Sequence, residues 1–251
     1  MTLGTALHEI MQKFVSKQAP HQTATCEIAA DNGWALKIAC DLTGLPGLCI
    51  RSLSDGDAPL LQVFGTKLGP VSKDLFCPYP WHEPNALPGA FQEAVRKTTA
   101  RVDASYVIES AHHGVIGHFF LWKAGGNPHS RPYQIEVPEL GVAIADDCQG
   151  RGLGGLSVRI LQAVARDLRA DAIELTTAFG NQAGWNTYRQ CGFEYLGDIN
   201  TPLGVDVTAA LAGGVAAASY RVERQMAYVI REENRERVLS YLAEKRKTAP
   251  A

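Results

Sequence analysis

The sequence predicts an α/β fold, in which amphipathic helices and short strands alternate along a chain of 251 residues. The first observation is a strand, a glycine-rich turn and a helix in direct succession, at residues 140–145, 149–155 and 156–168. The second is a pair of polar turns at 31–33 and 110–114, each between two strand-like segments, which predicts antiparallel hairpins. The third is composition, because 46% hydrophobic and 20% charged residues are typical of a soluble chain with a substantial core.

The first 47 residues are expected to form an extension that precedes the main domain. Apolar side chains at helical spacing predict a helix over 6–18, which Ala19-Pro20 ends. Two strands are expected next, at 25–30 and 34–40. This extension is expected to cover the sheet or to pack in a homodimer, with a direct contact to substrate as the alternative.

The main domain is expected over residues 48–230, and segment 231–251 is expected to add one charged helix. The predicted elements of the main domain are strand 48–53, helix 58–66, helix 89–97, strands 105–109 and 115–123, strand 136–145, helix 156–168, and strands 172–178, 194–197 and 219–230. Residues 54–57 supply polar caps for the first of these helices. Segment 76–85 predicts an irregular loop, and the Ala- and Gly-rich segment 200–218 predicts either a flap or a small helix.

Charge and residue usage exclude several classes of function. A formal net charge of −2 offers no basic field for a nucleic acid, so no nucleic-acid partner is expected. No apolar run approaches the ~20 residues that span a bilayer, and the N-terminus lacks a secretory signal, so a cytoplasmic protein without a membrane partner is expected. The six cysteines form no C-x-x-C pair and are expected to be free thiols. His112 and His113 have no spaced ligand partner, so no metal site is expected.

The glycine-rich turn, Gln149 to Gly155, lies where a strand ends and a helix begins. The first N–H groups of a helix have no partner within the helix and carry the positive end of its dipole. Glycines let the backbone approach a ligand closely, so this turn predicts a phosphate or pyrophosphate site. The alternative without a ligand is a turn that only packs the helix tightly on the sheet.

A second alternative is a dinucleotide-binding fold of an oxidoreductase. Gly150, Gly152 and Gly155 match G-x-G-x-x-G, the pattern of that fold. The following strand should then end in an acidic residue for the ribose hydroxyls. It ends in Leu175-Thr-Thr-Ala178 instead, which disfavours this alternative.

A third interpretation takes Gln149-x-x-Gly152-x-Gly154 as the motif, followed by Asn181, Tyr188 and Gly192-Phe193. These motifs, in this order and at this separation, resemble the acyl-CoA-binding signature of the GNAT N-acetyltransferase superfamily. The strong part of the resemblance covers residues 139–197, and weaker agreement extends over 48–230. The resemblance implies a mixed, mostly antiparallel, twisted sheet flanked by helices. We adopt this interpretation.

The resemblance also implies transfer of an acyl group, most simply acetyl from acetyl-CoA, to a primary amine that attacks the thioester directly. It assigns the pyrophosphate to the backbone of the glycine turn, the pantetheine arm to the end of the preceding strand, and a further contact to an asparagine. The expected CoA-binding residues are Val142, Ala143, Ile144, Gln149, Gly150, Arg151, Gly152, Leu153, Gly154, Gly155 and Asn181. Asn181 is also expected to cap the next helix. The acceptor can be a small amine, an antibiotic, an amino acid or a protein amine.

Tyr188 is the expected general acid, because a phenol with a pKa of about 10 is protonated at neutral pH and can protonate a departing thiolate. Glu139 is the first candidate for the general base. Some family members place a glutamate where this chain has Thr176, and Glu174 lies two residues earlier on the same face. The departure at Thr176 keeps a second function open, that of a catalytically silent module that binds acyl-CoA or a partner.

Overall fold

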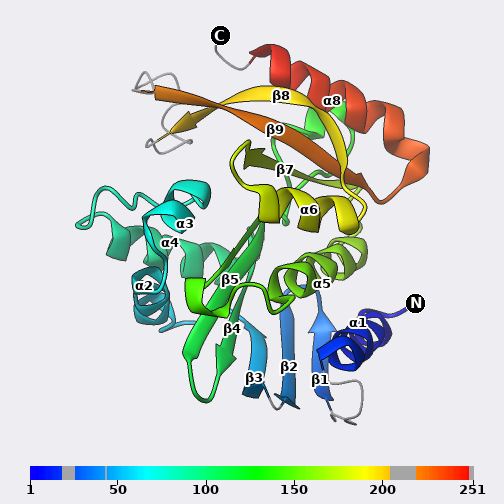
Figure 1. Cartoon of the computed structure of the whole chain (residues 1–251). Coiled ribbons are helices and arrows are strands. Elements are labelled where there is room, and N and C mark those ends of the chain that lie inside the picture. The colour runs from blue at the N-terminus through cyan, green and yellow to red at the C-terminus, as the bar shows by residue number, and fades with distance from the viewer. Residues whose placement is uncertain (19–25, 43, 204–218, 249–251) are drawn as a thin grey trace.

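The computed structural model describes residues 1–18, 26–42, 44–203 and 219–248. Within these residues, nine strands form one sheet in the order β1-β2-β3-β4-β5-β6-β7-β9-β8 (Figure 1). All neighbouring strands are antiparallel except β6 and β7, which are parallel. The predicted fold class, a mixed and mostly antiparallel sheet flanked by helices, is therefore confirmed.

The strands are β1 (Cys26–Asn32), β2 (Ala35–Leu42), β3 (Leu45–Ser52), β4 (Ala104–Ser110), β5 (Gly114–Trp122), β6 (Glu139–Ile144), β7 (Ala172–Ala178), β8 (Glu194–Leu203) and β9 (Ser219–Val229). The helices are α1 (Leu3–Gln18), α2 (Ala58–Thr66), α3 (Pro70–Leu75), α4 (Leu87–Thr99), α5 (Leu153–Asp167), α6 (Gln182–Gln190) and α8 (Arg235–Thr248). Short 3-10 turns occur at η1 (Arg131–Tyr133), η2 (Asp146–Cys148) and η3 (Glu232–Asn234). Within the described part of the chain, no helix is long and apolar enough to cross a membrane.

Several predicted boundaries were wrong, among them those of β6, β8 and α8. β6 begins at Glu139 rather than at 136, because Pro138 directly before it has no N–H to donate to a ladder. β8 continues to Leu203 rather than ending at Gly197, because that glycine forms an irregularity with φ 131° inside the strand. α8 begins at Arg235, after the turn η3, and not at 231. Helix α3 was not predicted, and most of segment 200–218 lies outside the described residues.

Two groups of helices cover opposite faces of the central strands. On one face, α5 packs against β5, β6 and β7, and α1 packs on α5 (Figure 1). On the other face, α2 packs on β5 and α4 packs on β4 and on α2. The side chains of β5 show the alternation: Phe119 stacks on Tyr106, whereas His118 and Phe120 contact the aromatic ring of Phe76 near α3. Helix α1 and the first hairpin thus join the same hydrophobic core as the rest of the sheet.

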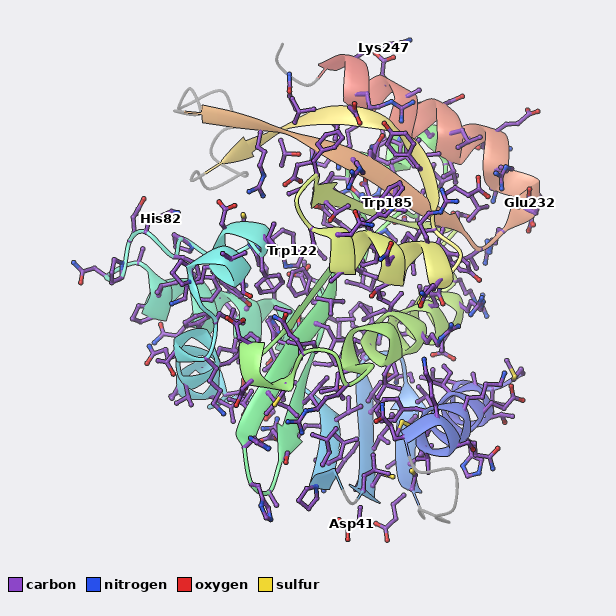
Figure 2. The ribbon with its side chains drawn as sticks, viewed as in Figure 1. Asp41, His82, Trp122, Trp185, Glu232 and Lys247 are labelled. Carbon is purple, nitrogen blue, oxygen red and sulfur yellow. The ribbon has the colours of Figure 1, made fainter. Side chains whose placement is uncertain are left out.

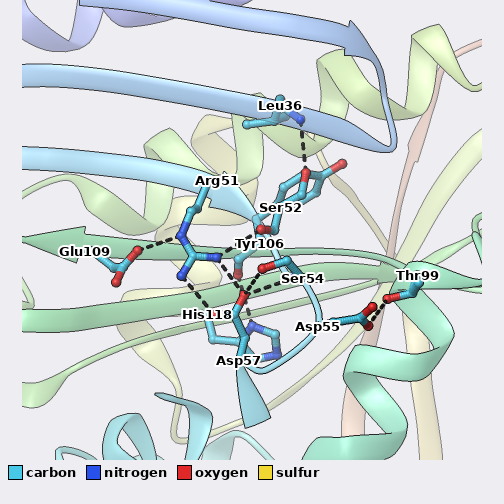
Figure 3. A network of polar contacts seen from close by, with 10 residues as sticks. All are labelled: Leu36, Arg51, Ser52, Ser54, Asp55, Asp57, Thr99, Tyr106, Glu109 and His118. Atoms are coloured by element: carbon cyan, nitrogen blue, oxygen red, sulfur yellow. Dashed lines mark hydrogen bonds and ion pairs between the residues drawn. The ribbon is translucent and has the colours of Figure 1, made fainter. Parts of the chain in front are cut away.

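The start of α2 is held by an ion pair rather than by the predicted side-chain cap (Figure 3). Asp57 occupies the N-cap position without a capping hydrogen bond. Its carboxylate accepts hydrogen bonds from the Arg51 guanidinium at 2.6 and 3.0 Å and from the backbone N–H of Ser54 at 2.8 Å. Arg51 also donates to Glu109 on β4 at 2.8 Å. A charge-assisted pair is stronger than a cap, so the carboxylate turns towards β3 instead of α2.

Candidate functional site

The strands β6 and β7 separate soon after they begin. Their register contains Glu139 opposite Glu174, at the amino-terminal part of β6 and β7. Beyond this point β7 stays paired with β9 on its other edge, up to Ala178 opposite Glu223. From Gly141 to Ile144, the edge of β6 that faces β7 therefore has no register partner on β7 within the described residues.

Alternation of the backbone decides which groups of β6 face this divergence. Ala145 donates its N–H to the carbonyl oxygen of Ile116 on β5, at 2.9 Å. Because neighbouring residues of a strand point their N–H groups to opposite sides, Ala143 also faces β5, and Val142 and Ile144 face the divergence. Among the three predicted residues, Val142 therefore offers its backbone groups to a ligand placed between β6 and β7, and Ile144 offers its N–H, since its carbonyl oxygen already accepts a hydrogen bond from Gln149.

The glycine turn leads directly into α5. Gly150 and Gly152 have φ angles of 74° and 76°, a conformation that favours glycine, and Gly152 is the N-cap residue of α5. A Cβ atom at Gly154 or Gly155 would meet no other atom within 4 Å, so the backbone there borders open space. The helix bond from Leu156 N–H to the carbonyl oxygen of Gly152 follows these residues. The N–H groups at the start of α5 are thus available to an anion.

The polar side chains of the turn are bound to the backbone around it. Gln149 donates from Nε2 to the carbonyl oxygen of Ile144 at 3.1 Å and to Ser72 Oγ of α3 at 3.3 Å. The guanidinium of Arg151 donates to the carbonyl oxygens of Gly44 at 3.2 Å and Asp147 at 3.4 Å. Gln149 thereby fixes the turn to the end of β6. A contact between Arg151 and a phosphate stays a prediction.

Asn181 begins α6, and its predicted role as N-cap is confirmed. Its Oδ1 accepts a hydrogen bond from the N–H of Gly184 at 2.9 Å. Its Nδ2 donates to Thr177 Oγ1 of β7 at 3.1 Å, which fixes the orientation of the amide. Helix α6 is therefore attached to the carboxyl end of β7, next to the divergence.

Tyr188 lies on α6 and is 8% exposed. Its ring packs on Phe193, with 5.9 Å between centroids. Burial, with smaller contributions from Cys191 and the carboxylate of Glu223, raises the pKa of Tyr188 to about 12. The phenol is therefore protonated at neutral pH, the form that a general acid requires.

Glu139 belongs to a cluster of charges at the paired end of β6 and β7, which we call the closed-end cluster: Glu139, Glu174, Tyr241 and Lys245. Lys245 of α8 lies 3.0 Å from a carboxylate oxygen of Glu174 and 3.9 Å from one of Glu139. Tyr241 donates to the other oxygen of Glu174 at 3.2 Å. Burial disfavours the charge of Lys245, but the two carboxylates outweigh it and raise its pKa. Side-chain exposure is 26% for Glu139 and 2% for Glu174, so Glu139 is the more accessible carboxylate.

A second group of charges lies at the other end of β7, and we call it the open-end bridge: Asp74, Arg221 and Glu223. Arg221 of β9 donates to Glu223 Oε1 from Nε at 2.9 Å and from Nη2 at 2.6 Å. Its Nη1 donates to Asp74 of α3 at 2.9 Å. The bridge thus ties α3 to β9, between segments far apart in the sequence.

The loop 76–85 has a packing role at its buried positions. The Tyr79 hydroxyl lies 2.8 Å from Nε2 of His118, which is completely buried. Trp81 donates to the carbonyl oxygen of Phe76 at 2.5 Å. Trp122, near the middle of the molecule in Figure 2, stacks on Phe120 with 4.7 Å between ring centroids and is the register partner of Glu139.

One trio within the described residues has the donor types of a metal site. Potential ligand atoms of His113, Asp147 and Cys148 lie within 4.8 Å of one another. His113 is in the turn between β4 and β5, and the other two residues directly precede the glycine turn. The sequence does not indicate this group, because His113 lies more than 30 residues before Asp147 and Cys148 along the chain.

A family model described as an acetyltransferase (GNAT) domain matches residues 47–194. The chain belongs to this family. A search of curated proteins finds no match. The strand, glycine turn and helix that carry the sequence resemblance all lie within the matched residues.

Solved structures of acetyltransferases share the fold at low sequence identity. A spermidine N-acetyltransferase from Vibrio cholerae, in complex with CoA and spermine, is 18% identical with a TM-score of 0.53, covering 72% of this chain and 95% of that one. A ribosomal L7/L12 alpha-N-protein acetyltransferase is 15% identical with a TM-score of 0.54, covering 85% and 99%. A ribosomal-protein-S5-alanine acetyltransferase from Vibrio fischeri is 11% identical with a TM-score of 0.53, covering 72% and 92%.

Proposed function

We propose that this GNAT protein transfers an acetyl group from acetyl-CoA to a primary amine. The observation that carries the proposal is the divergence of β6 and β7 directly before a glycine turn that starts α5. This arrangement puts the free edge of β6 next to the N–H groups at the start of α5. The edge can hydrogen-bond an extended ligand, and the N–H groups can bind its anionic part. The complex of the related fold from Vibrio cholerae with CoA and spermine supports the choice of cofactor.

The chain offers a binding group for each part of acetyl-CoA. The N–H groups that begin α5, in the turn from Gln149 to Gly155, would bind the pyrophosphate. The backbone of Val142 and Ile144 would hydrogen-bond the pantetheine arm and the thioester oxygen, where negative charge develops in the transition state. Asn181, at the start of α6, would contact the CoA molecule near the carboxyl end of β7.

The proposed reaction forms a C–N bond as the C–S bond of the thioester breaks. An acceptor that arrives as an ammonium ion loses two protons, one to a base and one that ends on the CoA sulfur. Tyr188 would give its phenolic proton to the departing sulfur and recover a proton from the nitrogen. Glu139 would take the first proton through a chain of water molecules, because its carboxylate is the accessible one at the paired end of β6 and β7.

The cofactor is tested by thermal unfolding with acetyl-CoA, CoA and NADH. A ligand at about a hundred times its dissociation constant stabilises the native state by about 2.7 kcal/mol. Stabilisation by acetyl-CoA and CoA but not by NADH is the expected result. No stabilisation by either CoA compound would overturn the proposal.

Catalysis is tested with Tyr188→Phe. The variant is expected to bind CoA like the wild type and to lose acetyl-CoA turnover by about 10²-fold or more. A wild-type protein that binds CoA without turnover for any amine tested would support the silent binding module instead.

A further inference from the structure

Two polar side chains share one face of β9 beside the carboxyl end of β7. Glu223 is opposite Ala178, and Gln225 is opposite Thr176, in the antiparallel register of β7 and β9. Side chains two residues apart in a strand lie on the same face, so Glu223 and Gln225 point to the same side of the sheet. Thr176, the position of departure from the family pattern, is the half-buried register partner of Gln225.

Gln225 carries an unsatisfied hydrogen-bond donor. Its side chain is completely buried, and Nε2 has no hydrogen-bond partner within the described residues. The orientation of the amide is determined, because Oε1 accepts a hydrogen bond from Arg246 of α8 at 2.6 Å and a guanidinium can only donate. Arg246 lies over Gly197 of β8, which is the register partner of Gln225 on the opposite side from Thr176 of β7. A buried donor without a partner costs free energy, and an oxygen atom of a ligand would remove that cost.

Glu223 has one carboxylate oxygen engaged and one available. Both hydrogen bonds from Arg221 go to Oε1, and Oε2 takes part in no hydrogen bond within the described residues. Arg221 is shared with Asp74, so two carboxylates face one guanidinium and the bridge has a net negative charge. The same carboxylate contributes to the raised pKa of Tyr188, so it acts electrostatically on the proposed general acid. Such a carboxylate suits a positively charged amine.

We propose that Glu223 and Gln225 form the acceptor site of this acetyltransferase, and that the acceptor is an α-amino group with a neighbouring carbonyl oxygen. Glu223 receives the ammonium group and Gln225 Nε2 donates to the carbonyl oxygen. Same-face side chains start ~6.6 Å apart along a strand, a separation that hydrogen bonds to two neighbouring ligand atoms can span. An amino-acid amide or a peptide amino terminus carries both groups, whereas a polyamine carries ammonium groups and no oxygen. This inference rests on the proposed acetyl transfer.

The test compares two small acceptors with the same skeleton, alaninamide and 1,2-diaminopropane, in which a CH2 group replaces the carbonyl. Wild-type kcat/KM, corrected for the fraction of neutral amine, is expected to favour alaninamide by about tenfold, the effect of one hydrogen bond. Equal rates, or a preference for the diamine, would overturn the proposal. Because this comparison uses the wild-type chain, it does not depend on the folding of any variant.

Two variants separate recognition from packing. Gln225→Met keeps the side-chain length and is expected to abolish the preference for alaninamide. Arg246→Met removes the hydrogen bond that orients the Gln225 amide and is expected to reduce the preference only in part. A preference that survives unchanged in Gln225→Met would overturn the assignment to Nε2.

Glu223→Gln tests the ammonium contact. It is expected to raise KM for both amines by about tenfold and to leave KM for acetyl-CoA unchanged. An unchanged amine KM would overturn the role of Glu223. Loss of acetyl-CoA binding by the wild type is a different failure, because it removes the proposed function itself and this acceptor site with it.

Discussion

The two ends of β7 carry similar charged groups in different surroundings. In the closed-end cluster, Glu174 is 2% exposed and is bonded by both Tyr241 and Lys245. In the open-end bridge, Arg221 donates to only one oxygen of Glu223 and also donates to the exposed Asp74. The Glu223 side chain is also buried, at 6% exposed, so the two carboxylates differ in how many of their oxygens are bonded. Removing the partner of a fully bonded buried carboxylate is costly to the fold, whereas a carboxylate with one unbonded oxygen can accept from a ligand. We therefore expect substitutions in the closed-end cluster to change mainly stability and substitutions in the open-end bridge to change mainly the proposed recognition of the amine.

The largest expected effect comes from removing the cation of the closed-end cluster. Lys245→Met leaves the Glu174 carboxylate buried without its charged partner, which typically destabilises a protein by about 3–5 kcal/mol. Urea unfolding of the variant measures this loss. Lys247→Met is the matched control on the same helix, because its side chain is 75% exposed and its pair with Glu244 contributes only about 0–1 kcal/mol. Equal stability of the two variants would contradict the contrast between the two ends.

Acid is expected to destabilise the protein at His118 of β5, outside both groups of charges. The two carboxylate groups should therefore be compared near neutral pH. Burial lowers the pKa of His118 from 6.5 to about 4. The unfolded chain therefore binds a proton between these values that the folded chain does not, and stability falls as the pH drops from 6.5 towards 4, by about 3 kcal/mol in full. Urea unfolding from pH 7 to pH 4 measures the fall. The free energy of unfolding of His118→Gln should fall less than that of the wild type over this range. An equal fall would show that other groups cause the acid sensitivity.

Replacing Glu139 should separate its chemistry from the stability of the cluster. Glu139→Gln is expected to lower kcat by about 100-fold, equivalent to about 2.7 kcal/mol. Stability should change little, since Lys245 lies closer to Glu174, at 3.0 Å, than to Glu139, at 3.9 Å. Glu194→Gln, an exposed surface glutamate, is the control. A wild-type kcat in Glu139→Gln would exclude Glu139 as the base.

The smallest expected effect concerns the exposed end of the bridge. Asp74 is 62% exposed, so Asp74→Asn should change stability by only about 0–1 kcal/mol. It also removes one negative charge from the bridge, which should raise KM for the amine by about two- to fivefold through weaker attraction. Steady-state kinetics at low and high salt measures this effect, which salt should reduce. A larger effect than that of Glu223→Gln would reverse the proposed order of the two carboxylates.

Most elements near the proposed cofactor site were predictable because local rules determine them. The strand β6, the glycine turn and α5 follow one another directly, so short-range patterns predict them. The φ angles of 74° at Gly150 and 76° at Gly152 show the conformation that favours glycine. The N-cap of Asn181 likewise involves Gly184, three residues away. The short α3 was missed because a helix of six residues has too little periodicity to recognise.

By itself, then, the sequence determined the α/β class and the glycine turn at the start of α5, because periodicity and backbone preference act over short separations. The resemblance to the family added the mostly antiparallel sheet and the helix that carries Tyr188. Only the tertiary structure decided which charges meet. Arg221 and Asp74 are 147 residues apart, and Glu174 and Lys245 are 71 residues apart. Pairing and burial of side chains depend on such distant contacts, and no local pattern encodes them. The unsatisfied amide of Gln225 became visible for the same reason, once β7, β9 and α8 had enclosed it.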